Sequence, residues 1–264
     1  MKAKLKVVSP QKITKTRATI LEINNLRKVF QVNDTYLNVL EGINFTAANG
    51  ELICILGRSG CGKSTLLKIL AGFIPPSSGS VLLNGQSVTT PGPDRCVVFQ
   101  EDTLFPWLTV QENIAFGLKP QTREKNVIRE EVDLFLSLVG LTEFKNYLPR
   151  EISGGMKQRV ALARVLVLKP DILLMDEPFA SLDTQTREEM QNLLLSLWEK
   201  LSHTVLFVTH DVNEAVTLAD RILVMDKDPG RVQEEMHVNL KRPRKKESRE
   251  FLHYSQYLYG ILRQ

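Results

Sequence analysis

The 264-residue sequence has no apolar run long enough to cross a membrane, which takes roughly 18–20 residues. A signal peptide is not expected either, because Ser9-Pro10 interrupts the short apolar pair Val7-Val8. Cysteine is scarce: Cys54, Cys61 and Cys96 are an odd number and have no metal-ligand spacing. These absences predict a cytosolic protein in a reducing compartment.

Acidic residues are almost absent from two terminal segments that hold the excess positive charge. Residues 1–19 carry six Lys or Arg and no acid, and residues 241–249 carry six with one Glu, so they contribute +6 and +5 to a net charge of +4. The rest of the chain therefore carries −7. Such segments attract anionic lipid headgroups or an acidic partner in one interpretation, and are solvated, mobile ends in a simpler one. The basic run lacks interleaved aromatic residues, so no nucleic-acid partner is expected.

The organisation along the chain indicates one elaborate domain with basic ends. The composition, 43% hydrophobic and 24% charged, is that of a globular protein. We interpret residues 1–19 as a flexible basic leader and 20–235 as an α/β domain. Residues 236–264 are interpreted as a basic tail that ends in a short helix over Phe251–Leu262.

Short apolar runs within the domain predict two kinds of strand. The continuous runs suit central parallel strands buried on both faces: Ile53–Leu56, Ile172–Met175, Val205–Val208 and Ile222–Met225. Leu21–Ile23 and Ser80–Leu83 are more typical of a smaller antiparallel sheet, with a turn at Asn84-Gly85.

A different pattern lies between these strands. Thr122–Val139 carries apolar residues at helical spacing, and Gly140 then ends the pattern. We therefore expect a helical insertion over about residues 101–164.

Gly57 to Ser64 fits the pattern of a phosphate-binding loop, because a strand precedes it and a helix-like segment, Ser64–Ala71, follows it. Its glycines let the backbone curl, so that N–H groups face phosphate oxygens at a positive helix N-terminus. Lys63 would reach the β- and γ-phosphates, and the Ser64 hydroxyl would bind Mg²⁺. Cys61 lies inside the loop, where a small side chain fits, although modification of its thiol would in principle block nucleotide.

Asp176 and Glu177 follow a buried apolar run and precede Pro178. Strand ends are where α/β sheets place their chemistry. Nucleotide hydrolysis needs one carboxylate near Mg²⁺ and one to polarise the attacking water. We assign Asp176 to the metal and Glu177 to the water.

Two further polar residues also follow predicted strands. His210 comes after Val205–Val208 and Thr209, where an imidazole would contact the γ-phosphate. Gln100 follows Val97–Phe99 and would ligate Mg²⁺ and sense the γ-phosphate. Neither residue alone would indicate a function, but the phosphate loop in the same chain favours a role for both at a nucleotide.

Ser153-Gly154-Gly155 precedes a helix-like stretch and has the chemistry of a helix N-cap. A capped helix with a glycine hinge is the simpler interpretation. The alternative is a second anion-binding helix N-terminus. Because the chain already has a complete phosphate loop, this second site would serve the nucleotide of another subunit.

Together these motifs resemble the nucleotide-binding subunits of ATP-binding cassette (ABC) transporters, over about residues 20–235. The resemblance implies a P-loop NTPase (RecA-like) core with a small antiparallel β subdomain and an inserted α-helical subdomain, and it implies ATP and Mg²⁺ as cofactors. It assigns ATP binding to Gly57, Arg58, Ser59, Gly60, Cys61, Gly62, Lys63, Ser64 and Thr65. Phe30 is placed against adenine, with Tyr36 as a rival for that role.

In that family two subunits enclose two ATP molecules, each between one phosphate loop and the partner's signature segment. Ser153, Gly154, Gly155 and Met156 match the signature, and Asp183, in Ser181-Leu182-Asp183, matches a loop that also faces the partner. Lys63, Gln100, Glu177 and His210 match the family's catalytic positions, while Ser64, Gln100 and Asp176 match its metal site.

Several segments narrow the resemblance to the nitrate, sulfonate and taurine importer group: Phe105–Asn113, Asp176–Phe179, Thr186-Arg187 and Pro229–Val232. Met156 stands where the superfamily usually has Gln, and the importer group carries a similar substitution at this position. The resemblance implies a second ATPase subunit, membrane permease subunits and, indirectly, a solute-binding protein as partners. It places the chain peripherally at the cytoplasmic face of the membrane. Leu104, Phe105, Trp107 and Leu108 would contact the permease, or else belong to an ordinary core.

Two other functions are open at this stage. One is a soluble cassette ATPase acting on nucleic acid or ribosomes, although such proteins usually carry two cassettes or a long coiled-coil insertion. The other is an export or lipoprotein-handling cassette, which the narrower motifs disfavour.

Overall fold

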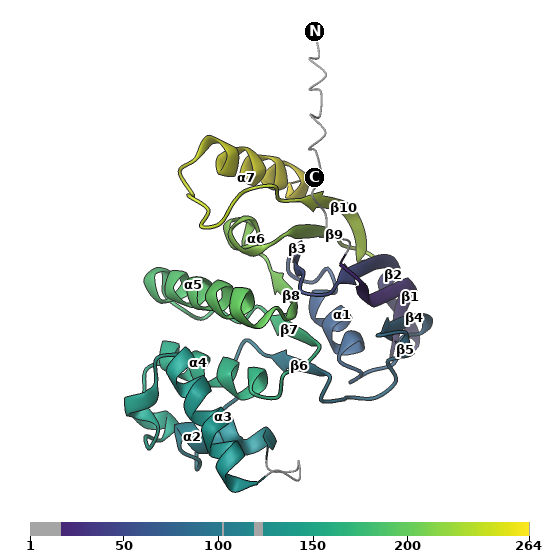
Figure 1. Cartoon of the computed structure of the whole chain (residues 1–264). Coiled ribbons are helices and arrows are strands. Elements are labelled where there is room, and N and C mark those ends of the chain that lie inside the picture. Colours follow the sequence, from purple (N-terminus) through teal and green to yellow (C-terminus); the bar gives the residue numbers. More distant parts are fainter. Residues whose placement is uncertain (1–16, 102, 119–123, 264) are drawn as a thin grey trace.

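Two β-sheets form the frame of the described part of the molecule (Figure 1). The computed structural model describes residues 17–101, 103–118 and 124–263. Positions 1–16 of the expected basic leader lie outside the described part.

Within the described residues, six strands form the larger sheet in the order β10-β9-β3-β8-β7-β6, and all neighbours are parallel except β10 and β9. Their bounds are Arg231–His237, Arg221–Asp226, Leu52–Gly57, Thr204–Thr209, Ile172–Asp176 and Arg95–Val98, in that order. Along β3, Leu52, Cys54 and Leu56 enter one core, whereas Ile53 and Ile55 enter the other. Both faces of the sheet are covered, which explains why the predicted strands are continuously apolar.

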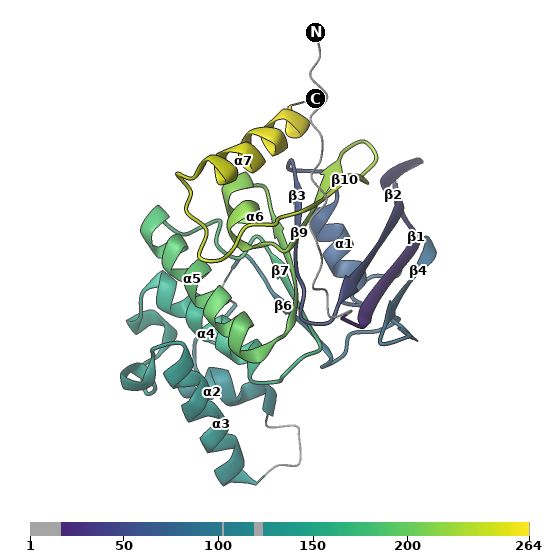
Figure 2. The same cartoon turned by 45° about the horizontal axis from the view of Figure 1, so that its top comes forward.

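The described residues also form a four-stranded antiparallel sheet in the order β2-β1-β4-β5. Its strands are β1 (Thr19–Val32), β2 (Thr35–Ala48), β4 (Ser78–Leu83) and β5 (Gln86–Ser87). The predicted turn is present, since Asn84 and Gly85 have φ of 51° and 75°. Helix α1 (Lys63–Leu70) lies between the two sheets and joins their shared core (Figure 2).

The predicted helical insertion lies between β6 and β7. It contains α2 (Val110–Ala115), α3 (Lys125–Leu138) and α4 (Gly154–Leu166), with 3-10 turns at Phe116–Leu118, Thr142–Phe144 and Pro149–Glu151. The remaining helices are α5 (Thr184–Leu201), α6 (Val212–Leu218) and α7 (Arg249–Leu262). The predicted α/β core with a small antiparallel sheet and inserted helices is confirmed. Among the described residues, no helix has the length and apolar character needed to span a membrane.

The basic segment before α7 is anchored to the domain, so the interpretation of residues 241–249 as a solvated, mobile end is wrong. Arg244 is half-buried, and its Nη1 atom donates to the carbonyl oxygens of Val216 (2.6 Å) and Ala219 (2.7 Å) at the end of α6. Helix ends leave such carbonyls without intrahelical partners. Burial lowers the pKa of Arg244 to about 10, so it remains a cation at neutral pH. Arg242 stacks on Trp198, with its guanidinium carbon 4.6 Å from the ring centroid.

Replacing Arg244 with methionine is expected to lower the free energy of unfolding by about 2–4 kcal/mol, because several buried carbonyls lose a charged donor together. Urea denaturation of the purified chain measures this loss. Lys245→Met is the matched control, since Lys245 is exposed and its replacement should change stability by less than about 0.5 kcal/mol. Equal losses in the two variants would contradict the anchoring role.

Candidate functional site

The predicted phosphate-binding loop lies at the edge of the larger sheet where the parallel strands β3, β7 and β8 end. A hollow of about 400 Å³ opens there, which we call the phosphate hollow. It is lined by Val39, Ser59, Gly60, Gly62, Lys63, Ser64, Thr65, Gln100, Asp176 and Glu177. The carboxyl ends of parallel strands are the usual ligand-binding edge of α/β sheets. Most of the residues predicted from separate motifs therefore meet in one place.

Glycines fix the path of the phosphate loop. Gly60 and Gly62 have φ of 85° and 95°, a region that other residues avoid. A Cβ atom on Gly62 would lie 2.6 Å from Cδ2 of Leu40, because β2 packs directly on the loop. A Cβ atom on Gly230 would collide with the carbonyl oxygen of Cys61. The N-cap residue of α1 is Gly62, which has no side chain to cap the helix, so backbone N–H groups at this N-terminus remain for a phosphate.

Cys61 has a packing role in this loop. It is 1% exposed, and its sulfur would lie only 2.6 Å from a Cβ atom on Gly57. Burial also raises the pKa of the Cys61 thiol. Because the thiolate is the reactive form, a buried thiol of this kind is inert. Cys61 therefore fits the interpretation as a small side chain that packs in the loop, and not that of a thiol whose modification blocks nucleotide.

Lys63 lies at the floor of the phosphate hollow and is 5% exposed. Its ammonium group donates to the carbonyl oxygens of Gly57 (2.8 Å) and Arg58 (3.1 Å). It also lies 3.6 Å from Oε1 of Glu177. A fixed cation between the loop carbonyls and an acid suits a group that meets a phosphate chain.

Ser64, Asp176 and Gln100, whose side chains carry oxygen atoms, line the same hollow. The Ser64 hydroxyl donates to Oδ1 of Asp176 at 3.0 Å; burial raises the pKa of Asp176, and this hydrogen bond opposes the rise. The described residues hold no group of three or more His, Cys, Asp or Glu suited to a metal. Mg²⁺ typically takes one or two carboxylates and completes its shell with phosphates and water. The donor set therefore fits a metal that arrives with a nucleotide.

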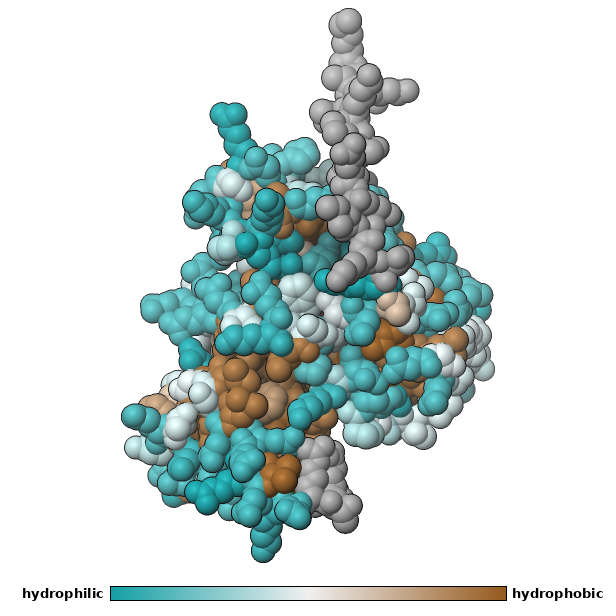
Figure 3. Space-filling model, in the orientation of Figure 1, coloured by the Kyte–Doolittle hydropathy of each residue, from teal (hydrophilic) through white to brown (hydrophobic). Residues whose placement is uncertain are grey.

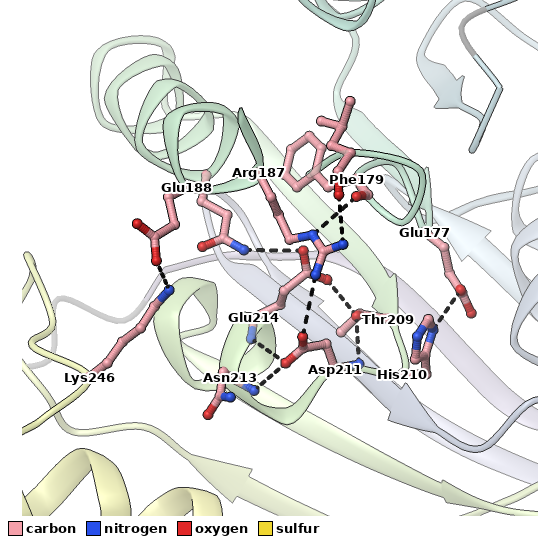
Figure 4. A network of polar contacts seen from close by, with 12 residues as sticks. Glu177, Phe179, Arg187, Glu188, Thr209, His210, Asp211, Asn213, Glu214 and Lys246 are labelled. Atoms are coloured by element: carbon pink, nitrogen blue, oxygen red, sulfur yellow. Dashed lines mark hydrogen bonds and ion pairs between the residues drawn. The ribbon is translucent and has the colours of Figure 1, made fainter. Parts of the chain in front are cut away.

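Glu177 occupies a strained turn directly after β7. Its φ of 46° is unusual for a residue with a side chain. The turn is held by a hydrogen bond from the Glu177 N–H to the Val208 carbonyl at 3.1 Å. Its Oε2 atom lies 2.7 Å from Nδ1 of His210 (Figure 4). Such strain clusters at functional sites, and here it brings a carboxylate and an imidazole together beside Lys63.

Several predicted nucleotide contacts do not line the phosphate hollow: Phe30 and its rival Tyr36, Gly57, Arg58, Cys61 and His210. Phe30 is half-buried, with the Lys28 ammonium 4.8 Å from its ring centroid, and Tyr36 is 76% exposed. Arg58 lines a separate hollow of about 160 Å³ beside the end of α7. Val39 of β2 also lines the phosphate hollow, although no sequence motif marks it.

Ser153 begins α4 as its N-cap, as predicted, and its Oγ atom accepts a hydrogen bond from the Met156 N–H at 3.3 Å. A second hollow of about 260 Å³ lies here, which we call the signature hollow. It is lined by Gly140, Leu141, Phe144, Ser153, Gly155, Met156, Arg159, Thr186 and Glu189. The two hollows share no lining residue, so the predicted signature and phosphate-loop residues are not brought together within one chain.

Asp183 is connected to the signature hollow through Thr186. A Cβ atom on Gly155 would lie 2.6 Å from Cγ2 of Thr186, so α4 and α5 are in close contact at this point. The Thr186 N–H donates to Oδ1 of Asp183 at 3.0 Å, which makes Asp183 the N-cap of α5. Asp183 and Ser153 are both exposed.

Comparison with known proteins agrees with this geometry. A family model described as "ABC transporter" matches residues 40–180. The chain belongs to the ABC transporter family. It is an ATPase of that family, as its motifs predict.

This ABC ATPase has relatives with named transport roles. The nitrate import ATP-binding protein NrtD of Synechocystis is 44% identical over 252 residues, 92% of this chain and 95% of the relative. The bicarbonate transport ATP-binding protein CmpD of Synechococcus elongatus is 45% identical over 234 residues, 86% of this chain and 83% of the relative. A solved structure of the ATP-binding cassette MJ0796 shows a dimer in a post-hydrolysis state, bound to ADP and phosphate. Its match to this chain has a TM-score of 0.73 and 31% sequence identity, and it covers 84% of this chain and 100% of the MJ0796 chain.

The ABC ATPase also carries an aromatic cluster in its helical insertion. The ring centroids of Phe105 and Phe116 are 4.3 Å apart, and those of Phe105 and Trp107 are 5.7 Å apart. Trp107 is 71% exposed, whereas Leu104 and Leu108 are half-buried. On the face shown in Figure 3, hydrophobic residues also gather over the insertion in the region of α4. Exposed apolar surface of this kind is typical of protein contacts.

Proposed function

We propose that this ABC ATPase is the ATP-binding and hydrolysing subunit of an importer for a small solute such as nitrate, a sulfonate or taurine. The observation that supports it most is that Glu177, which lines the phosphate hollow with Lys63, contacts both Lys63 and His210. This site can hold a triphosphate and polarise water beside it. The named nitrate and bicarbonate transport relatives favour a small oxyanion-like solute.

In the proposed reaction, Glu177 orients and polarises the attacking water, and His210 contacts the γ-phosphate while holding the Glu177 carboxylate in place. Lys63 neutralises charge on the β- and γ-phosphates. Ser64, Asp176 and Gln100 would hold Mg²⁺, which supplies further charge neutralisation when bound. Phe30 is the candidate for stacking on adenine, with Tyr36 as its alternative.

A second subunit completes the site in this proposal. Ser153, Gly154, Gly155, Met156 and Asp183 would act in trans, because the signature hollow is separate from the phosphate hollow of the same chain. ATP would then join two subunits, which would separate after hydrolysis as the products leave. The dimeric state of the MJ0796 cassette with ADP and phosphate supports this arrangement.

Permease subunits are the proposed membrane partners, with the chain held peripherally at the cytoplasmic face and a solute-binding protein acting indirectly. The exposed Trp107 and its neighbours Phe105 and Phe116 are the proposed contact. Aromatic anchors of this kind typically dominate the energy of an interface.

Affinity purification from detergent-solubilised membranes tests the proposal. The tagged chain should retain membrane permease subunits, and the reconstituted complex should take up nitrate, a sulfonate or taurine in the presence of ATP. Trp107→Ala should weaken permease retention by roughly tenfold or more, as expected of an aromatic anchor. Recovery with ribosomes or DNA and without a permease would contradict the importer function.

A further inference from the structure

Glu214 is a buried acid outside the phosphate hollow, in the first turn of α6. It is 7% exposed, and its two hydrogen-bond donors are uncharged. The Thr209 hydroxyl donates to Oε2 at 2.6 Å, and the Gln191 amide donates to Oε1 at 3.1 Å. Burial raises the pKa of Glu214, because removing a carboxylate from water is unfavourable and lowers the stability of the fold. A buried polar group that is fully hydrogen-bonded fixes one arrangement of the elements around it.

One side of this network holds the backbone on both sides of His210 (Figure 4). Thr209 Oγ1, bound to Glu214, also accepts a hydrogen bond from the Asp211 N–H at 2.9 Å. Oδ1 of Asp211 in turn caps α6 by accepting from the N–H groups of Asn213 (2.7 Å) and Glu214 (3.2 Å). The hydrogen bonds of Thr209 and Asp211 therefore fix the backbone before and after His210, whose imidazole contacts the Glu177 carboxylate.

The other side of the network reaches the loop that ends at Asp183. Gln191 lies one turn after Arg187 on α5, so the two side chains share a face of that helix. Arg187 donates from Nε to the Phe179 carbonyl at 3.3 Å and from Nη2 to the Leu182 carbonyl at 2.9 Å. Its Nη1 atom lies 3.9 Å from Oδ2 of Asp211, so α5 bridges the loop before Asp183 and the segment around His210.

We propose that Glu214 is a positioning residue for ATP hydrolysis, which with Gln191 and Arg187 holds the Phe179–Asp183 loop and His210 in a fixed relation. A contact made by Asp183 with a partner subunit then sets the place of His210 beside Glu177 in the same chain. This inference rests on the proposed function, since it takes His210 and Asp183 to act at the nucleotide. Glu214 itself is buried and does not line the phosphate hollow.

Glu214→Met is the principal test, because methionine has a similar volume and leaves Thr209 and Gln191 without their acceptor. We expect kcat for ATP hydrolysis to fall about tenfold while KM for ATP stays within about twofold, because binding groups are untouched and only the alignment of the reacting groups is lost. Glu214→Gln should restore kcat to within about threefold of the unmodified chain, since an amide can bond both neighbours. Val224→Ala, in the core strand β9, is the control for lost stability alone.

A double-mutant cycle separates positioning from general stability. In a His210→Ala background, Glu214→Met should lower the residual single-turnover rate by less than about twofold, because the residue acts through His210. A full tenfold loss in that background, or a kcat for Glu214→Met no lower than that of Val224→Ala, would overturn the inference. Glu177→Gln is assayed in parallel: if it abolishes turnover while Glu214→Met does not lower it, the inference fails alone. If neither change affects turnover, the proposed function fails with it.

Discussion

Replacing Glu177 with glutamine is expected to lower kcat for ATP hydrolysis about 10²–10³-fold and to leave ATP affinity within about twofold. The amide keeps the size of the carboxylate, so the strained turn after β7 and its hydrogen bond to Val208 should persist. It lacks the negative charge that polarises water, and it lacks the acceptor strength that holds His210 at 2.7 Å. The chemical step should therefore stop while the phosphate hollow stays intact.

The same variant should accumulate as an ATP-bound dimer, because the step that separates the subunits is blocked. Size-exclusion chromatography with light scattering in ATP and Mg²⁺ measures the dimer, and phosphate release measures turnover. Glu188→Gln is a suitable control, since Glu188 is an exposed acid that pairs with Lys246 and lines neither the phosphate hollow nor the signature hollow. A Glu177→Gln chain that hydrolyses ATP normally, or remains monomeric in saturating ATP, would contradict the proposed mechanism.

The phosphate hollow was predictable from the sequence because its chemistry follows strand ends. Asp176 directly follows a buried apolar run and His210 follows another after Thr209, and parallel strands bring their carboxyl ends to one edge. The glycine pattern of the loop is likewise local, as the positive φ angles of Gly60 and Gly62 show. The apolar runs, the glycine pattern and the order of the motifs therefore indicated which residues would lie near one another here, without knowledge of distant contacts.

The residues that the sequence did not reveal depend on contacts between distant segments. Val39 enters the phosphate hollow only because β2 packs against the loop near Gly62. In the sequence, Arg244 is one of several neighbouring charged residues. Its role depends on the carbonyl groups that the end of α6, more than twenty residues earlier, leaves without partners in the helix. Glu214 resembles any acid in the first turn of a helix until Thr209 and Gln191 are seen to bury it. No local pattern distinguishes these side chains from their solvated counterparts.

Replacing Gly154 with aspartate is expected to lower ATP hydrolysis on the order of 100-fold without destabilising the chain. Within one subunit a Cβ atom on Gly154 meets nothing within 4 Å, and the residue is exposed. An acid in the first turn of α4 even interacts favourably with the helix dipole, by about 0.3–1 kcal/mol. The loss must therefore arise where a second subunit presents its triphosphate to this N-terminus, because like charges repel there. Steady-state hydrolysis and thermal melting of the purified chain measure the two effects.

Gly154→Asn is the matched control for size, since asparagine has nearly the same shape without the charge and should lose much less activity. Gly155→Ala distinguishes a defect within the chain from one in trans. Its Cβ atom would lie 2.6 Å from Cγ2 of Thr186, so the alanine variant should melt earlier and be rescued by Thr186→Ser, which removes that methyl group. The Gly154→Asp defect should show neither the earlier melting nor the rescue. If Gly154→Asp instead hydrolysed ATP at the unmodified rate, this helix N-terminus would not face a nucleotide, and the assignment of Ser153–Met156 to the partner's site would be wrong.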